Sequence, residues 1–280
     1  MAATVRIGIV GAGNNTRTRH IPGLQAIPGV ELVSVCNRSR ESSQRVADAF
    51  GIPQVYDTWR DLITATDIDA VVIGTWPYMH REMACAVLEA GKHVMCEARM
   101  AMNAAESHAM LAASQAHPNL IAQIVPSPFT FRVDRTIQDL LAEGYLGDLH
   151  AMSIRGGSST FNDASAPLHW RQRQTLSGYN IMNMGIWYEA ALRWVGPVER
   201  VYARGRIVTP QRLDPETNQM SPVDVPDHID MIADLPNGAQ ATYTFSAVSG
   251  LGPAPGAWLF GSKGTLHYDQ DSRKLWGGKP

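Results

Sequence analysis

Short β-branched segments alternate with helical patterns along the first 125 residues, and this alternation leaves few possible folds. Strands that are joined through helices form parallel sheets with helices on both faces. Such sheets bind ligands beyond the carboxyl ends of their strands. We expect strands at residues 5–10, 31–37, 70–75, 92–97 and 120–125, and helices at 39–50, 80–91 and 101–117.

The pattern changes after residue 125. A helix at 133–144, a strand at 150–157 and a helix at 180–194 precede segments that alternate like antiparallel strands. Pro236-Asn237-Gly238 predicts a hairpin turn, because Asn and Gly tolerate positive φ. We expect two domains, at residues 1–125 and 126–280. The late strands are expected at 198–208, 228–235, 239–248, 257–262 and 264–269.

Composition excludes several classes of protein. The 280 residues are 45% hydrophobic, enough for a large core, and the net charge of −2 gives no basic surface for nucleic acid or a membrane. No run approaches the roughly 20 apolar residues of a membrane helix, and no secretory signal layout is present. The three cysteines have no metal or redox spacing. We expect a cytoplasmic protein with buried free thiols and no metal.

The first strand runs directly into a glycine loop. Gly11 and Gly13 follow the strand and precede an expected helix. A dinucleotide site needs this order, because a tight turn brings bare backbone to the pyrophosphate at a helix N-terminus. Thr16 stands where the third glycine of the motif is expected. A nucleotide site is favoured over a purely structural turn.

The end of the second strand bears on the choice of nucleotide. NAD sites usually carry an acid here for the ribose 2′-hydroxyl. This chain has Asn37, Arg38, Ser39 and Arg40 instead. Arg38 can form charge-assisted bonds with a 2′-phosphate, which a carboxylate would repel. We therefore expect NADP(H) rather than NAD(H), the alternative being that these arginines are a solvated helix start.

Several stretches, in order, resemble the Gfo/Idh/MocA oxidoreductases, the family of glucose–fructose oxidoreductase and inositol dehydrogenase. They are IGIVGAG, VVIGTWPYMH, AGKHVMCEARM, AEGYLGDL, SGYNIMNMGIWYEAALRWVG and FGSKGTLHYD. The resemblance implies an α/β protein with an N-terminal Rossmann domain. It also implies a C-terminal α+β domain with an open, mainly antiparallel sheet, through which members commonly form homo-oligomers. We expect a dimer or tetramer on that analogy.

The same resemblance implies that several of the family's usual active-site residues are replaced here. Its usual Lys and Pro are Ala98 and Arg99 here, and its helix Asp and His are Asn183 and Trp187. The glycine run before that helix contains Tyr179. The family continues past its late hairpin, whereas this chain stops at LWGGKP, so we expect either a shortened chain or a partner over that surface.

Glu97 and Arg99 end the strand at 92–97, where nicotinamide and substrate are expected to meet. Arg99 stays protonated, so it cannot be a general acid or base near neutral pH, but it can clamp a carboxylate or stabilise an oxyanion. The alternatives are an Arg99–Glu97 ion pair or a surface arginine.

Other candidates come from the second domain. Asn183 and Trp187 are four apart on one helical face, so Asn183 can bind a substrate oxygen and Trp187 can wall the pocket or belong to the interdomain core. Tyr179 is the best remaining proton donor. Tyr188 shares its chemistry, and Trp170 can belong to a substrate loop. We take Tyr179, Asn183, His80 and Arg99 as catalytic candidates and Trp187, Tyr188, Glu97 and Trp170 as substrate contacts.

His80 follows Thr75 at the family's spacing. It can orient the cofactor or contact Glu97, or be a structural histidine at a helix start. His169 can belong with Trp170 to a substrate loop, and the other histidines, His20 among them, have no ligand spacing and are given no role. The expected cofactor-binding residues are Gly11, Gly13, Asn14, Asn15, Asn37, Arg38, Ser39, Thr75, Trp76, His80 and Glu97.

These observations favour an NADP(H)-dependent oxidoreductase acting on a small carbonyl, hydroxyl or imine compound. Tyr179 and Trp187 make the expected pocket aromatic, so a cyclic or aromatic substrate is favoured, with a carboxylate for Arg99. Two alternatives stay open. The protein can bind NADP(H) without turnover, as a sensor or inactive partner subunit, or catalyse a non-redox reaction such as dehydration or decarboxylation.

Overall fold

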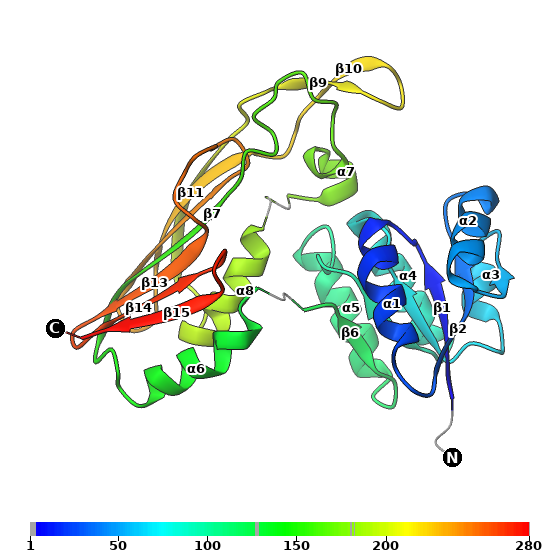
Figure 1. The fold of residues 1–280 in the computed structure, drawn as a ribbon, viewed down its shortest axis with the longest axis horizontal. Helices are drawn as coiled ribbons and strands as arrows, with labels where there is room; N and C mark the ends of the chain where they lie inside the picture. Colours follow the sequence, from blue (N-terminus) through cyan, green and yellow to red (C-terminus); the bar gives the residue numbers. More distant parts are fainter. Residues whose placement is uncertain (1–3, 127–128, 180, 182, 280) are drawn as a thin grey trace. The chain divides into compact units, whose positions relative to one another are not determined.

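The computed structural model describes residues 4–126, 129–179, 181 and 183–279. The chain forms two compact units, Met1–Pro126 (unit 1) and Ser127–Pro280 (unit 2), and each is described by itself (Figure 1). The first part of the helix expected at 180–194 includes Asn180 and Met182, which lie outside the described residues.

Unit 1 is built on a six-stranded parallel sheet in the order β3-β2-β1-β4-β5-β6. This order reverses direction at β1 and β4, which is the point at which such folds bind nucleotides. The expected parallel sheet is confirmed. Its strands are β1 (Val5–Val10), β2 (Val30–Cys36), β3 (Gln54–Val55), β4 (Ala70–Ile73), β5 (His93–Cys96) and β6 (Ala122–Ile124).

Helices cover both faces of this sheet. Alternation along the strands sends Ile9 toward Ile21 and Val46 in one core cluster, and Ile73 toward Leu62 and Val87 in the other. Side chains of Ser39, Thr58 and Asn103 cap α2, α3 and α5. The helices are η1 (Thr16–His20), α1 (Ile21–Gln25), α2 (Arg40–Phe50), α3 (Trp59–Thr64), η2 (Pro77–Met79), α4 (His80–Glu89) and α5 (Ala104–Ala116).

Unit 2 holds a seven-stranded sheet in the order β15-β14-β13-β7-β12-β11-β8. Every neighbouring pair is antiparallel except β7 and β12, which run parallel at the centre. The β11–β12 hairpin turns at Pro236–Gly238 as expected, with φ of +80° at Gly238. The strands are β7 (Leu149–Gly157), β8 (Arg200–Arg206), β11 (His228–Asp234), β12 (Gln240–Ser246), β13 (Gly256–Gly261), β14 (Thr265–Asp269) and β15 (Lys274–Gly278).

One face of this sheet is covered by α6 (Phe131–Ala142) and α8 (Met184–Val195) (Figure 1). Ile154, Tyr243 and Tyr268 point into that core from β7, β12 and β14. The other face carries a row of register partners that crosses all seven strands. In strand order they are Tyr202, Ile232, Thr242, Ser153, Trp258, His267 and Trp276.

A separate two-stranded sheet, β9 (Gln211–Asp214) and β10 (Gln219–Pro222), completes unit 2 with the short helices η3 (Trp170–Gln172) and α7 (Gln174–Ser177). Arg212 is buried there, and its guanidinium donates to the carbonyls of Phe161 and Ala166. Among the described residues, no helix is both long and apolar enough to cross a bilayer.

Candidate functional site

The glycine loop of unit 1 is a tight turn that only glycine fits. Gly11 has φ of +83°, and an added Cβ would lie 2.7 Å from both the backbone nitrogen and the Cγ2 of Thr75. The N–H of Gly11 donates to the carbonyl of Cys36 at 2.8 Å, which ties the turn to the end of β2. The loop therefore lies between the ends of β2 and β4.

Asn37 fixes the shape of this loop. Its Oδ1 accepts the N–H of Ala12 at 2.7 Å, and its Nδ2 donates to the carbonyl of Ser42 at 3.1 Å. The amide therefore links the glycine loop to the start of α2. Asn37 was expected to contact the cofactor, but both of its polar atoms are used within the chain, so its place in the structure is that of a loop clamp.

The missing third glycine has a structural explanation. Thr16 is buried, and its hydroxyl donates to the carbonyl of Gly11 at 3.2 Å. It packs against Gly74 at the end of β4, where any Cβ would collide with the Thr16 side chain. Gly74 thus supplies the close approach that a third glycine otherwise gives.

The start of the helical segment 14–25 has room for a pyrophosphate. A Cβ on Gly13 would meet nothing nearer than 3.8 Å, and Gly13, Asn14 and Asn15 are exposed. The first N–H groups of a helix have no intrahelical acceptor, so they favour an anion at this end. The residues present therefore fit a dinucleotide.

Glu97, at the end of β5, is held by two residues from the segment after the glycine loop. His20 Nε2 lies 2.5 Å from Glu97 Oε1, and the Asn15 side-chain amide donates to the same oxygen. The other carboxylate oxygen accepts the N–H of Ala98 at 3.0 Å. Asn15 and Glu97 were expected in one site, whereas His20 was given no role.

The environment of Glu97 keeps it ionised. Burial favours its neutral form, but the hydrogen bonds from His20 and Asn15 outweigh burial and lower the pKa of the carboxyl. A carboxylate is an acceptor only, so Glu97 offers acceptor oxygen beside the glycine loop. This charge sits at the carboxyl edge of the parallel sheet.

His80 is fully buried, and its ring connects two loops. Its Nε2 lies 3.0 Å from the carbonyl of Thr75, and its Nδ1 lies 2.8 Å from the carbonyl of Arg99. Both ring nitrogens thus face backbone oxygen rather than open space. This geometry favours the structural role over contact with Glu97 or a proton-transfer role, and it fixes the position of Arg99 through its backbone.

The residues after β2 are exposed. Ser39 caps α2 by accepting the N–H of Ser42, and the neighbouring Arg38 is exposed. Arg40 Nη1 lies 2.8 Å from Asp57 Oδ1 in an exposed ion pair. Two arginines therefore flank Ser39 at the edge where β2 ends, with no acid at Asn37.

The candidate residues of unit 2 differ in how exposed their side chains are. Tyr179 is 62% exposed, so its phenol is accessible. Asn183 is half-buried directly before α8, and its Oδ1 lies against Gly156 of β7, where an added Cβ would approach to 2.7 Å. Gly156 therefore makes room for the Asn183 amide.

Trp187 belongs to the core of unit 2. It is 0% exposed, with ring centroids 6.4 Å from Phe129 and 6.1 Å from Tyr268. Large side chains of its own unit enclose it, which favours a core position over the expected pocket wall. The four-residue spacing predicted a shared face with Asn183, but this spacing cannot distinguish a face in the core from a face in a pocket.

Tyr188 and Trp170 also contact their own unit. Tyr188 packs edge-on against Tyr243 at 6.4 Å, and Trp170 stacks under the Arg171 guanidinium at 4.2 Å. Both are only partly buried. The structure thus gathers Gly11, Gly13, Asn15 and Glu97 in unit 1, while the unit 2 candidates form a separate set.

Two family models match this chain in succession. One, described as an oxidoreductase family with an NAD-binding Rossmann fold, matches residues 5–123, and the C-terminal domain model of the same family matches residues 135–267. The chain belongs to the Gfo/Idh/MocA family. It is therefore an NAD(P)-binding oxidoreductase by family, with the two-domain fold that the resemblance implied.

Relatives of this Gfo/Idh/MocA chain include trans-1,2-dihydrobenzene-1,2-diol dehydrogenase of Mus musculus, 27% identical over 97% of this chain and 75% of that protein. A 4-carboxy-2-hydroxymuconate-6-semialdehyde dehydrogenase of Sphingobium is 36% identical over 40% of this chain and 35% of its own length. A solved levoglucosan dehydrogenase, in complex with NADH and L-sorbose, has a TM-score of 0.85 at 22% identity, covering 99% of this chain and 76% of that one. The last likeness shows the fold alone.

Proposed function

We propose that this chain is an NADP(H)-dependent oxidoreductase that acts on a small cyclic or aromatic carbonyl, hydroxyl or imine compound. The observation that carries the proposal is the glycine loop of unit 1. Gly11 and Gly13 leave bare backbone at a helix start, and the Glu97 carboxylate is held beside the same loop. Bound there, the cofactor supplies hydride chemistry, so the protein has to position it and supply a proton.

The preference for NADP(H) rests on the end of β2. Asn37 carries no charge and its amide is engaged in the loop, so it neither repels a 2′-phosphate nor replaces the ribose-binding acid. Arg38 and Ser39 are exposed beside it and offer donors to phosphate oxygens.

The substrate class rests on the relatives and on three side chains. One relative is named for a cyclic diol and another for a carboxylated semialdehyde. We assign Arg99 as the clamp for a substrate acid group, Tyr179 as the proton donor and Asn183 as a hydrogen-bond partner of a substrate oxygen. The 62% exposure of Tyr179 leaves its phenol open to a ligand.

Nucleotide preference is tested by removing one arginine at a time. Arg38→Ala should raise the dissociation constant of NADPH about tenfold or more, as for a lost charge-assisted hydrogen bond, and change that of NADH little. Quenching of tryptophan fluorescence measures both constants. Arg40→Ala is the matched control, because it removes an equal charge two residues further along, at the start of α2. Tighter binding of NADH than of NADPH by the unmodified protein would contradict the preference.

The proton donor is tested in a single turnover. Tyr179→Phe should slow the chemical step by roughly 10²–10⁴-fold, the usual cost of losing a general acid. Stopped-flow absorbance of the reduced nicotinamide, with a panel of cyclic ketones, imines and aromatic acids, gives the rate. Tyr145→Phe, at another tyrosine of unit 2, controls for the loss of a hydroxyl. An unchanged rate in Tyr179→Phe removes this residue from the mechanism.

A second candidate function is nucleotide binding without turnover, as a sensor or partner subunit. It is favoured by Ala98 and Trp187, which the resemblance matches to the family's usual lysine and histidine, and by the burial of Trp187. NADPH binding with no absorbance change across the panel would support it. Consumption of a substrate without any nicotinamide signal would support the non-redox alternative.

A further inference from the structure

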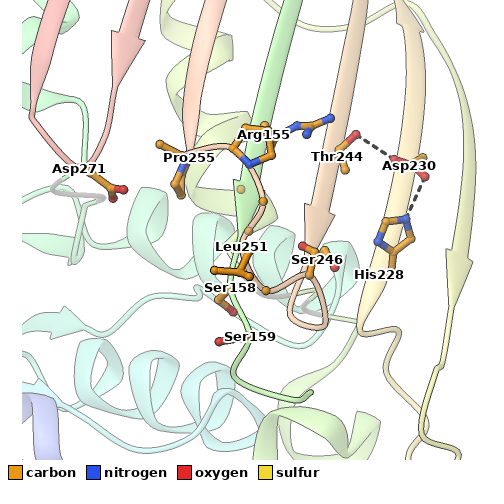
Figure 2. A pocket seen from close by; sticks show the side chains of 17 residues that line it. Arg155, Ser158, Ser159, His228, Asp230, Thr244, Ser246, Leu251, Pro255 and Asp271 are labelled. Atoms are coloured by element: carbon orange, nitrogen blue, oxygen red, sulfur yellow. Dashed lines mark hydrogen bonds and ion pairs between the residues drawn. The ribbon is translucent and has the colours of Figure 1, made fainter. Parts of the chain in front are cut away.

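A cavity of about 550 Å³ lies at one end of the large sheet of unit 2. This volume is within the range of roughly 300–1,000 Å³ that is typical of small-molecule sites. The ends of β7, β11 and β12, the loop 249–255 and the β14–β15 turn line it (Figure 2). All of its lining residues belong to unit 2, so it is distinct from the glycine loop and Glu97.

Glycines on the sheet face leave space at this point, because they carry no side chain. Arg155 of β7 has Thr244 of β12 as one register partner and Gly256 of β13 as the other. Gly256 must stay glycine, since an added Cβ would lie 2.5 Å from the carbonyl of Tyr268. Gly157 follows on the same face of β7, and a Cβ there would meet only Ser249 Oγ at 3.6 Å.

Asp230, an acid of the lining whose charge interacts with that of Arg155, already has its hydrogen bonds. Asp230 accepts from Thr244 Oγ1 at 2.8 Å through one oxygen and lies 2.9 Å from His228 Nε2 through the other (Figure 2). Burial favours its neutral form, but the bonds from His228 and Thr244 and the charge of Arg155 outweigh burial and lower the pKa of Asp230. Asp230 is thus an ionised acceptor with each oxygen occupied.

Arg155 retains its donors. Its guanidinium forms no hydrogen bond or ion pair with any residue in the described part of the chain, and it points toward Thr244 in Figure 2. A half-buried guanidinium with five N–H donors is best satisfied by anionic oxygens. An acid group on a ligand would satisfy these donors.

The rest of the lining limits the occupant to one acid group. Ser159 and Ser249 are among the lining residues and carry hydroxyls. The Asp271 carboxylate stands at the β14–β15 rim (Figure 2). A second acid group would be repelled by Asp271 and Asp230, whereas ligand hydroxyls can donate to a carboxylate and exchange hydrogen bonds with serines.

We propose that this cavity is a binding site for a small hydroxylated monocarboxylate, with the acid group on Arg155 and the hydroxyls toward Asp271 and the serines. The site does not depend on the proposed nucleotide function, because every residue in it belongs to unit 2. Its occupant is recognised by one charge and several neutral hydroxyls.

The test compares D-gluconate with sorbitol, which differ in one end group, carboxylate against alcohol. Titration calorimetry of the full chain without nucleotide should give saturable binding of gluconate and much weaker binding of sorbitol. Arg155→Gln should weaken gluconate binding about tenfold or more. Gly157→Val, which adds bulk to the cavity without removing a charge, should weaken it as well.

Arg135→Gln is the charge control, since Arg135 is 86% exposed on α6, on the helix side of the sheet. It should leave gluconate binding unchanged. The proposal is overturned if gluconate does not bind, if sorbitol binds equally well, or if Arg135→Gln costs as much as Arg155→Gln. Circular dichroism reports whether each variant is folded, and should Arg155→Gln not fold, Gly157→Val decides the question.

Discussion

Glu97 owes its charge to residues that lie far from it along the chain. The carboxyl is partly buried, which by itself would raise its pKa, and His20 and Asn15 reverse that effect. Local sequence around residue 97 contains neither partner. At the scale of single residues, the site is therefore defined by contacts between the segment after β1 and the end of β5.

We expect His20→Ala to raise the pKa of Glu97, because burial stays while a major opposing contact is lost. A lowered folded-state pKa stabilises the native state above the unfolded value, 4.5, and that stabilisation is lost as the pH falls below it. In His20→Ala, the acid-induced loss of stability that this carboxyl causes should therefore be smaller and should end at higher pH. Thermal unfolding midpoints between about pH 3 and pH 6 measure this.

His108→Ala controls for the loss of an imidazole, since His108 is exposed on α5. In Glu97→Gln, the part of the pH dependence of the unfolding midpoint that comes from this carboxyl should disappear. Adding His20→Ala to Glu97→Gln should then leave the remaining pH dependence unchanged. A His20→Ala profile that overlays the unmodified protein would contradict the role of this contact.

The elements differ in how visible they are in the sequence. Strands β1, β2, β4 and β5 follow from the sequence because apolar side chains, β-branched in most of these strands, fill both faces of a buried parallel sheet. β9 was missed because its buried positions are Arg212 and Asp214, so its hydrophobic pattern is inverted. β3 is two residues long and β15 contains two glycines, so neither carries a usable period.

The candidate site, like the fold, could be predicted from the sequence only where it depends on local residues. The glycine turn can be predicted from local sequence, because only glycine fits the positive φ at position 11 and the close contact with Thr75. The loop clamp of Asn37, the pairing of His20 with Glu97 and the burial of Trp187 each depend on a partner distant in sequence. Spacing alone cannot supply such partners.

At the scale of the whole molecule, we propose that the uncovered face of the large sheet joins copies of this chain as a dimer or tetramer. Its central row includes Tyr202, Ile232 and Trp276, with exposures of 71%, 50% and 54%. Exposed apolar side chains spread across one sheet face, from one edge strand to the other, favour association. The row lies beside the cavity proposed above, not within it.

Ile232→Glu should therefore lower the mass measured by sedimentation equilibrium to that of one chain, because a carboxylate would have to be buried against apolar side chains. Leu213→Glu is the control, since Leu213 is a comparably exposed apolar residue on β9. An unmodified protein that sediments as a single chain, or equal dissociation by both variants, would sink this proposal.

The parallel pairing of β7 with β12 also governs the order in which unit 2 can assemble. β7 leaves the ribosome early, but both of its neighbours in the sheet, β12 and β13, are synthesised much later. Closing such a long loop costs entropy before any contact repays it. During synthesis β7 therefore has unpaired edges, and α6 and α8 are made before most of the sheet that buries them.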